Sequence, residues 1–557
     1  MDFDLLLTHA DDRRPVLDEA FPPHAASHQP RPTEHASEET SLRGDLIKPG
    51  VDPNSLPDQR WGVVIPEGPL GDRLLALIEP LRRLREEEQG APARVYRVPP
   101  GLEGVAAIRW KDSVLRDEAK PETEQPAYLL MLGDFDQVPL HLQQVLGSDR
   151  FAGRLAFASE AGYEAYVDKV LRWSRAPTPV RRADALLFTA HDGTAATTVG
   201  YQALMAPSLE SLRMEQELGN LSVESIMEVG TPADWSLQRL LAQAASPQPS
   251  VLFTMSHGLG VPRGGWRSAE EQRARQGAMS LGAQGTLEGS DLASTPFLPG
   301  GLWFFFACFS AGTPARSAYY PWLSRLRETG QYAGRLERLL AALPRQGERP
   351  FTAALPQAAL ANPTGPLAVV GHADLAWSYS FQDVRSAGRN RPSRFQGLLR
   401  TLVEGRRAGV GLGALLHFFN EANAELTTLY EGEEAARVEG RSNPVDPTER
   451  AHLWMLRQDL AGYILLGDPA VRLPLASTEA ALSRSLPTLP AQPLMPDASA
   501  PRSAEGMATA VLRLLGGQES ARDIASWAHV PVEELHHWRR VYMEAGLKAL
   551  AELRPSG

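Results

Sequence analysis

At 557 residues the chain is too long for one compact domain, and typical domain sizes predict about three or four. A formal net charge of −11 argues against a general affinity for nucleic acid, and one cysteine cannot form an internal disulfide. No uncharged apolar stretch reaches the roughly 18 residues that a membrane helix needs. These properties predict a cytoplasmic protein with no membrane partner.

Three large regions follow from the pattern along the chain. Residues 1–60 are rich in Pro, His, Asp and Glu without periodicity, which predicts an extended or disordered segment, or a strap laid over a folded body. Strand-like and helical stretches then alternate over a first α/β unit, 61–180, and a larger one, 181–475, as in a mainly parallel sheet covered on both faces. The expected elements are a helix over 71–88 and strands over 61–66, 93–99, 127–133, 184–193, 250–258, 302–310 and 366–374.

The end of the chain differs in composition. Residues 476–506 are rich in Pro and Ser, which predicts a linker. Residues 507–557 are short and helical in pattern, which predicts a small all-α unit.

Two strands of the larger unit end in residues with catalytic potential. One runs into His257 and Gly258, and the other runs into Cys308. Ligands of open parallel sheets bind beyond the carboxyl ends of the strands, so we expect these residues at one edge. An imidazole beside a thiol activates it as a nucleophile. The sequence therefore predicts His257 as the general base, Cys308 as the nucleophile, and the N–H groups of Gly258 and Cys308 as oxyanion donors.

Each of these signals taken alone indicates packing more often than catalysis, because buried strand-end cysteines and Ser-His-Gly turns are common. The order of the two residues, their separation of 308 − 257 = 51 positions and their place on the sheet favour a catalytic pair. His372 is a rival for the base, although it follows the cysteine in the chain.

The residues around this pair resemble a known family. TMSHGLG (254–260) followed by FFFACFSAGTP (304–314) is similar to the caspase-like cysteine peptidases, which include caspases, gingipains, separase and bacterial CHAT-domain proteins. The resemblance implies a caspase-like three-layer αβα sandwich in two adjacent subdomains, with catalysis in the second and protein as the substrate. The gingipain type is the most similar, through 126–139, 153–159, 166–175 and the Gly-Asp-Pro segment 463–474.

The specificity pocket is not given by the motif, because Phe306 stands where related peptidases often carry an Asp for a basic P1 side chain. The resemblance implies that the segment after the strand next to the cysteine strand lines this pocket. Asp374 would then face an Arg or Lys side chain and Trp377 would form a wall, while the alternative for Asp374 is a loop cap. The long Gly- and Arg-rich stretch 260–291 is expected to gate the cleft or to be a surface insertion.

The tail over 521–552 resembles the helix-turn-helix of transposases and small regulators, with Leu535 and Trp538 packed inward. Glu533 and Glu534 at the start of the second helix would repel phosphate, so docking of a protein partner stays open beside DNA binding. Adjacent histidines on a helix point apart, so we expect no metal site. The residues that could reach DNA are His536, His537, Arg539 and Arg540.

These observations predict an intracellular cysteine endopeptidase of the caspase and gingipain type that needs no cofactor. Cleavage of one specific partner protein in stress, cell death or antiviral defence is an expectation from family analogy. The alternatives are a catalytically silent scaffold, a DNA-binding regulator that acts through its C-terminal unit, and a non-peptidase hydrolase with the same two residues.

Overall fold

The computed structural model describes residues 2–29, 51–115, 125–175, 180–383 and 389–476, together with most of 507–542. The chain forms two compact units, Met1–Thr478 and Glu479–Gly557. Of the expected linker 476–506, only Ala476 lies among the described residues.

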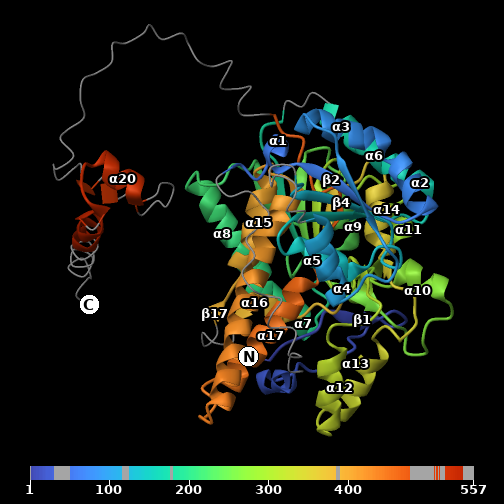
Figure 1. The fold of residues 1–557 in the computed structure, drawn as a ribbon. Helices are drawn as coiled ribbons and strands as arrows, with labels where there is room; N and C mark the ends of the chain where they lie inside the picture. The colour runs from blue at the N-terminus through green and yellow to red at the C-terminus, as the bar shows by residue number, and fades with distance from the viewer. Residues whose placement is uncertain are drawn as a thin grey trace. The chain divides into compact units, whose positions relative to one another are not determined.

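A ten-stranded sheet runs through the first unit (Figure 1). Its strands are β2 (Trp61–Pro66), β3 (Arg94–Val98), β4 (Tyr128–Leu132), β5 (Phe151–Leu155), β6 (Asp184–Thr189), β7 (Ser225–Glu228), β8 (Ser250–Met255), β12 (Leu302–Phe306), β15 (Ala368–His372) and β18 (Tyr463–Gly467). Their order is β3-β2-β4-β5-β18-β15-β12-β8-β6-β7, and every neighbouring pair is parallel except β15 and β18. The predicted α/β class with a mainly parallel sheet is confirmed.

Strand β18 joins the two halves of this sheet. It comes near the end of the unit Met1–Thr478, yet it lies between β5 and β15. Leu465 of β18 is paired with Gly153 on one side and with Val370 on the other. The two α/β regions expected from the sequence therefore share one continuous sheet.

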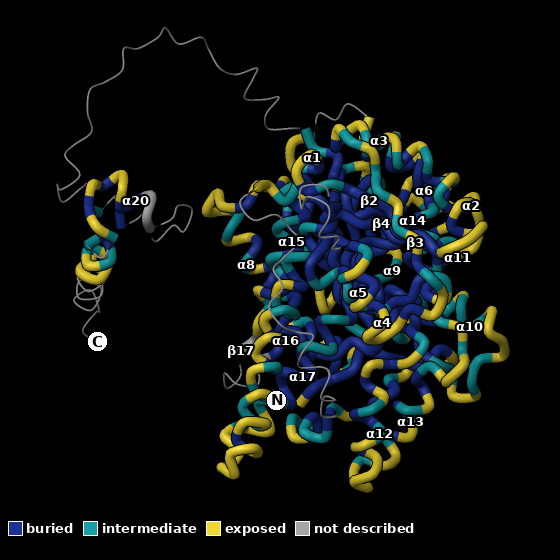
Figure 2. Tube along the Cα trace, viewed as in Figure 1, coloured by how far each residue is buried: buried dark blue, intermediate teal, exposed yellow. Residues whose placement is uncertain are grey.

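Helices cover both faces of the sheet, and its strands are buried apart from the edge strands β3 and β7, which are partly exposed (Figures 1 and 2). The α-helices are α1 (Leu56–Gln59), α2 (Pro69–Leu77), α3 (Glu79–Gln89), α4 (Val105–Trp110), α5 (Leu140–Gly147), α6 (Glu160–Arg175), α7 (Ala195–Gly200), α8 (Ala206–Glu217), α9 (Leu237–Ala244), α10 (Ala269–Arg275), α11 (Gly289–Leu292), α12 (Tyr320–Glu328), α13 (Ala333–Ala341), α14 (Ala354–Ala361), α15 (Ser393–Val403), α16 (Ala408–Val438) and α17 (Pro447–Ala461). Neighbouring side chains of a strand enter different cores: Val63 and Ile65 belong to one cluster and Val64 to another.

The stretch expected as one helix over 71–88 is two helices. Helix α2 ends at Leu77 and α3 begins at Glu79, with Pro80 in its first turn. Proline has no backbone N–H, so it fits the first turn of a helix and interrupts a longer one. The proline therefore explains the break.

Residues 2–29 lie as a strap against the body of the first unit. Within the strap, β1 (Leu7–His9) joins a small sheet with β9 (His257–Gly260), β10 (Met279–Ser280) and β11 (Thr286–Leu287). Further along, Ala25 accepts a hydrogen bond from Trp322 Nε1 at 2.8 Å. Residues 30–50 of the same expected segment lie outside the described residues.

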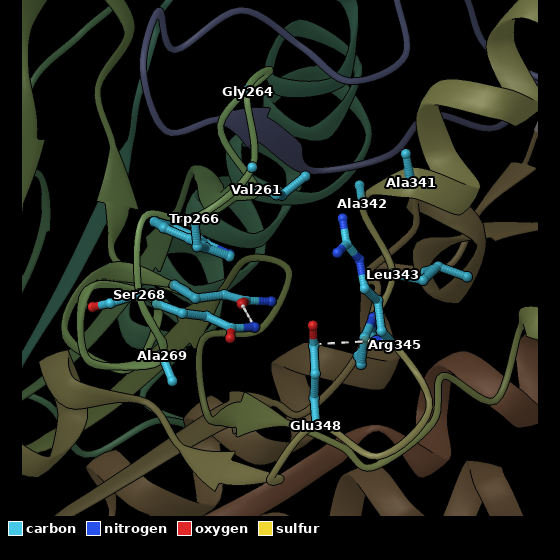
Figure 3. A pocket seen from close by; sticks show the side chains of 14 residues that line it. Val261, Gly264, Trp266, Ser268, Ala269, Ala341, Ala342, Leu343, Arg345 and Glu348 are labelled. Atoms are coloured by element: carbon cyan, nitrogen blue, oxygen red, sulfur yellow. Dashed lines mark hydrogen bonds between the residues drawn. The ribbon is translucent and has the colours of Figure 1, made fainter.

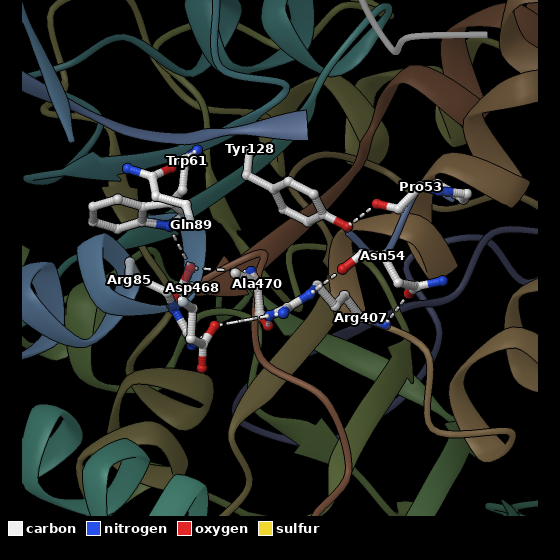
Figure 4. Close-up of polar contacts among 10 residues, drawn as sticks. Pro53, Asn54, Trp61, Arg85, Gln89, Tyr128, Arg407, Asp468 and Ala470 are labelled. Carbon is white, nitrogen blue, oxygen red and sulfur yellow. Dashed lines mark hydrogen bonds and ion pairs between the residues drawn. The ribbon is translucent and has the colours of Figure 1, made fainter. Parts of the chain in front are cut away.

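A buried polar network links the first half of the sheet to the segment after β18 (Figure 4). Asp468 is fully buried and accepts hydrogen bonds from Arg85 Nε at 2.8 Å and from Trp61 Nε1 at 3.0 Å. Next to it, Arg407 donates to the carbonyl oxygen of Asn54 at 2.9 Å. Both charges of the Arg85–Asp468 pair are removed from water, so each needs the attraction of the other to offset the cost of its own desolvation.

The second unit contains α20 (Ala521–Trp527) and a small core of its own. Ile524, Ala525 and Leu535 are buried in that core, and Trp538 packs against it. Among the residues that the structure describes in either unit, no helix has the length and apolar character needed to cross a membrane.

Candidate active site

His257 and Cys308 leave the sheet side by side. Strands β8 and β12 are parallel neighbours in which Met255 aligns with Phe306, and each of the two site residues comes two positions later. Gly258 lies directly against the cysteine, because a Cβ at this position would lie 1.9 Å from the carbonyl oxygen of Cys308. Only glycine permits this approach of the two backbones.

Two backbone N–H groups at this edge converge on one oxygen. The N–H groups of Gly258 and Cys308 donate to the carbonyl oxygen of Leu6, at 3.0 and 3.3 Å. Two such donors around one carbonyl oxygen form the arrangement that stabilises an oxyanion during acyl transfer. The oxygen that they hold in this structure belongs to the strap of the same chain.

The thiol of Cys308 is fully buried. Its Sγ accepts a hydrogen bond from Ala376 N at 3.1 Å and donates to Ala376 O at 3.5 Å. Burial raises the pKa of the thiol well above its usual value. Because the thiolate is the reactive form of cysteine, this burial opposes reaction of the thiol.

The imidazole of His257 is oriented by two polar residues. Its Nε2 lies 2.8 Å from Thr194 Oγ1 and 3.7 Å from Asp192 Oδ2, and Thr194 Oγ1 also donates to Asp192 Oδ1 at 2.8 Å. Burial lowers the pKa of His257, while the charge of Asp192 opposes that change. Within the described part of the chain, Nδ1 of His257 has no hydrogen-bond partner. The ring is thus a neutral base with one free nitrogen.

Asp192 and Thr194 are the members of this group that the sequence reasoning missed. They follow β6, which lies next to β8 in the sheet, and so they emerge at the same edge. The rule that selected His257 and Cys308 could have found them, because they are polar residues within five positions of the end of a buried parallel strand.

The structure places Asp374 in a loop-capping role. Its carboxylate accepts hydrogen bonds from Ala318 N at 2.7 Å and from Leu375 N at 2.8 Å. Burial raises the pKa of Asp374 to about 6. These contacts correspond to the loop cap that the sequence analysis kept as the alternative to a pocket for a basic side chain.

Trp377 lies inside an aromatic cluster that includes part of the strap. Its ring centroid is 5.4 Å from that of Phe3 and 5.8 Å from those of Tyr319 and Trp322. The indole therefore forms a wall against which the strap packs.

His372, the rival base, is engaged elsewhere. Its Nδ1 and Nε2 each lie 2.9 Å from a backbone carbonyl oxygen, those of Asp374 and Asp459. Burial lowers the pKa of His372 to about 4. Neither ring nitrogen is available to Cys308.

A cavity of 310 Å³ opens away from the candidate pair, between the loop after β9 and the chain after α13 (Figure 3). Val261 and Trp266 lie on one side of it and Arg345 and Glu348 on the other. It includes neither His257 nor Cys308, both of which are fully buried.

The C-terminal residues considered for DNA binding belong to the second unit. His537, Arg539 and Arg540 are exposed and His536 is half-buried, whereas Leu535 on the same helix is buried. The polar side chains are thus on the outside of their own unit.

A buried acid that contacts the chain after β15 makes the free energy of unfolding depend on pH. Asp459 Oδ1 accepts a hydrogen bond from Trp377 N at 2.9 Å, and burial raises the pKa of Asp459 from 3.8 to about 7. Between these values the folded protein holds a proton that the unfolded chain has lost, so the free energy of unfolding falls as the pH rises.

We therefore expect the melting temperature of Asp459→Asn to fall less, or rise more, from pH 5 to pH 8 than that of the wild type. Thermal unfolding of both proteins over this range measures the effect. Asp72→Asn, at an exposed carboxylate, serves as the control and should leave the slope unchanged. Equal slopes for wild type and Asp459→Asn would contradict the expectation.

No protein-family model matches the chain, and no curated protein sequence matches it. Among solved structures it is similar to the Arg-specific cysteine proteinase gingipain R (RgpB), at 13% identity and a TM-score of 0.41 over 75% of this chain and 78% of that one. The complex of Porphyromonas gingivalis RgpB pro- and mature domains gives 13%, 0.40, 74% and 79%, and a structure described as a protease gives 13%, 0.38, 77% and 80%.

Proposed function

We propose that the protein is a cysteine endopeptidase of the caspase and gingipain type, with Cys308 as the nucleophile and His257 as the general base. The observation that carries this proposal is the convergence of Gly258 N and Cys308 N on one carbonyl oxygen. This pair of donors lies beside a cysteine and next to a neutral, buried histidine. Acyl transfer needs these three parts together.

In the reaction, a substrate carbonyl oxygen takes the place between the two N–H groups. Nδ1 of His257 accepts the thiol proton, and Sγ forms a bond to the carbonyl carbon. The C–N bond then breaks, the amine leaves with the proton from His257, and a thioester remains. His257 next takes a proton from water, which attacks the thioester and releases the acid and the thiol. Asp192 and Thr194 orient the imidazole.

Two changes must precede this reaction. Sγ has to give up its hydrogen bonds with Ala376 and approach His257. The carbonyl oxygen of Leu6 has to leave the N–H groups of Gly258 and Cys308. Leu6→Arg is a variant that promotes the second change, because a guanidinium cannot replace a leucine side chain that is 1% exposed without losing its hydration.

A catalytically silent scaffold is the second candidate, and a specific observation favours it. The thiol is hydrogen-bonded to Ala376, and burial raises its pKa. Labelling of Cys308 with an iodoacetamide probe at neutral pH, in wild type and in Leu6→Arg, separates the two candidates. Reactivity no higher than that of free cysteine in both proteins would favour the scaffold.

The peptidase proposal is tested by cleavage of an unfolded protein substrate in the Leu6→Arg background. We expect Cys308→Ala to abolish cleavage and His257→Ala to reduce kcat by about 100-fold or more, the usual contribution of a general base. His417→Ala, at an exposed histidine, is the matched control and should be neutral. Cleavage that survives Cys308→Ala would overturn the assignment.

The same proposal places the enzyme in the cytoplasm, where it would act on one partner protein in stress, cell death or antiviral defence. The C-terminal unit would dock that partner or DNA through His536, His537, Arg539 and Arg540, of which the last three are exposed on one helix of that unit. Gel shifts and pull-downs with and without residues 507–557 distinguish DNA from protein.

A further inference from the structure

The strap runs through the candidate site as an extended peptide. Leu6 N donates to Ala376 O at 3.1 Å, Ser378 N donates to Asp4 O at 3.0 Å, and Asp4 N donates to Ser378 Oγ at 2.9 Å. Leu5 forms an antiparallel bridge with Trp377 between these contacts. An extended chain that pairs in this way with the backbone of a binding protein is a general mode of peptide recognition.

The register of this peptide singles out Leu6. Its carbonyl oxygen is the one held by Gly258 N and Cys308 N, while its N–H is held by Ala376 O. Leu6 therefore stands where a substrate would present the residue before the bond to be cleaved, the P1 residue.

The side chains of the peptide enter apolar surroundings. Leu5, Leu6 and Leu7 are 2%, 1% and 0% exposed and belong to the main hydrophobic core. Phe3 packs against Trp377 and Tyr379, with ring centroids 5.4 and 4.9 Å apart. Leu6 itself is 1% exposed within this core, so its place favours an aliphatic P1 side chain and disfavours a charged one.

The peptide continues past the oxyanion donors on the other side. Strand β1 pairs in parallel with β9, so that Leu7 aligns with Gly258. Two segments hold this part in place. In the loop after β9, Arg263 Nε lies 2.9 Å from Asp12 Oδ2, and in the turn between β10 and β11 Gly282 O accepts a hydrogen bond from Arg13 Nε at 2.7 Å. The chain thus occupies the groove on both sides of the Leu6 carbonyl.

We propose, on the basis of the peptidase function above, that residues 3–9 fill the substrate groove as an internal peptide with Leu6 in the P1 place. The groove then takes extended peptides with an aliphatic P1 residue, and it stays closed to them while this segment is docked. The docked peptide remains intact because Sγ is hydrogen-bonded to Ala376 and makes no hydrogen bond to Nδ1 of His257.

The first test opens the groove. Leu6→Arg should increase the rate of Cys308 labelling by iodoacetamide at least tenfold over wild type, whereas Arg14→Ala, an exposed change in the same segment, should leave it unchanged. Circular dichroism and thermal unfolding verify that each variant folds. If Leu6→Arg does not fold, Leu6→Ala takes its place, with a smaller increase expected.

The second test measures the preference of the groove. A fluorescein-labelled peptide with the sequence of residues 2–10 should bind the Leu6→Arg protein, as measured by fluorescence anisotropy. The same peptide with Arg at the Leu6 position should bind at least tenfold more weakly.

Cleavage measures the same preference. Reporter peptides with Phe-Asp-Leu-Leu before the scissile bond should be cleaved about 100-fold faster than those with Phe-Asp-Leu-Arg, since a charge cannot be buried there without a partner.

The outcomes separate this inference from the function on which it rests. Cys308-dependent cleavage with a preference for Arg, or labelling that Leu6→Arg does not change, overturns the inference and leaves the peptidase intact. Selective binding of the residue 2–10 peptide without cleavage by any variant supports the groove and overturns the peptidase. Equal binding of the two labelled peptides overturns the inference.

Discussion

Replacing Gly258 with alanine is expected to lower kcat for peptide cleavage by about 100-fold or more in the Leu6→Arg background, because removal of one oxyanion donor has an effect of this size. The added methyl group would lie 1.9 Å from the Cys308 carbonyl oxygen, which is backbone and cannot move aside without shifting the cysteine. Both oxyanion N–H groups and the nucleophile would be displaced together. Steady-state kinetics on an unfolded protein substrate measures the loss.

Gly264→Ala is the matched control for this prediction. Gly264 lies in the loop after β9, and a Cβ built there has no atom within 4 Å. In the Leu6→Arg background, we expect this variant to keep nearly the full kcat of Leu6→Arg alone. Thermal unfolding of both variants separates a damaged site from a damaged fold. Full activity of a folded Gly258→Ala protein would contradict the proposed oxyanion site.

Asp468→Ala is expected to destabilise the first unit by about 3–5 kcal/mol, the usual cost of removing one partner of a buried ion pair. Arg85 is 2% exposed, and it would keep only its contact with Glu88 at 2.8 Å. Trp61 Nε1 and Ala470 N would also lose their acceptor. Because this network joins the first half of the sheet to the chain after β18, we expect the loss of stability to affect the whole sheet.

Asp72→Ala provides the comparison. Asp72 also pairs with an arginine, Arg97, but the two side chains are 61% and 45% exposed. Ion pairs of this kind contribute about 1 kcal/mol or less. Urea unfolding of the two variants, followed by circular dichroism, measures the difference. Equal destabilisation by Asp468→Ala and Asp72→Ala would show that burial of the Arg85–Asp468 pair carries no special weight.

The strands, and the place of His257 and Cys308 just beyond two neighbouring strands, could be predicted because their signals are local. Runs such as LWFFF (302–306) are apolar on both faces, which is the property of a strand covered by helices on both sides. The strand ends then placed Cys308 and His257 at one edge without knowledge of the rest of the chain. The break near Pro80 was missed because the apolar spacing continues across it, although proline itself was the available signal.

The partners of the site residues required the tertiary structure. Thr194 is hydrogen-bonded to His257, which is 63 positions away in the chain. Ala376 is hydrogen-bonded to Cys308, which is 68 positions away. Asp374 was expected either to face a basic substrate side chain or to cap a loop. Only the fold brings Ala318 N to its carboxylate.

The sequence alone determined the α/β class, the parallel strands and the residue types at their ends, because apolar periodicity and strand-end chemistry depend on short stretches of chain. The tertiary structure alone decided that β18 unites the two halves of the sheet and that Leu6 lies against Gly258, 252 positions away. Such contacts form between distant segments whose own patterns do not encode their partners. The state of the proposed site, which is filled by the chain's own strap, therefore became visible only in the folded protein.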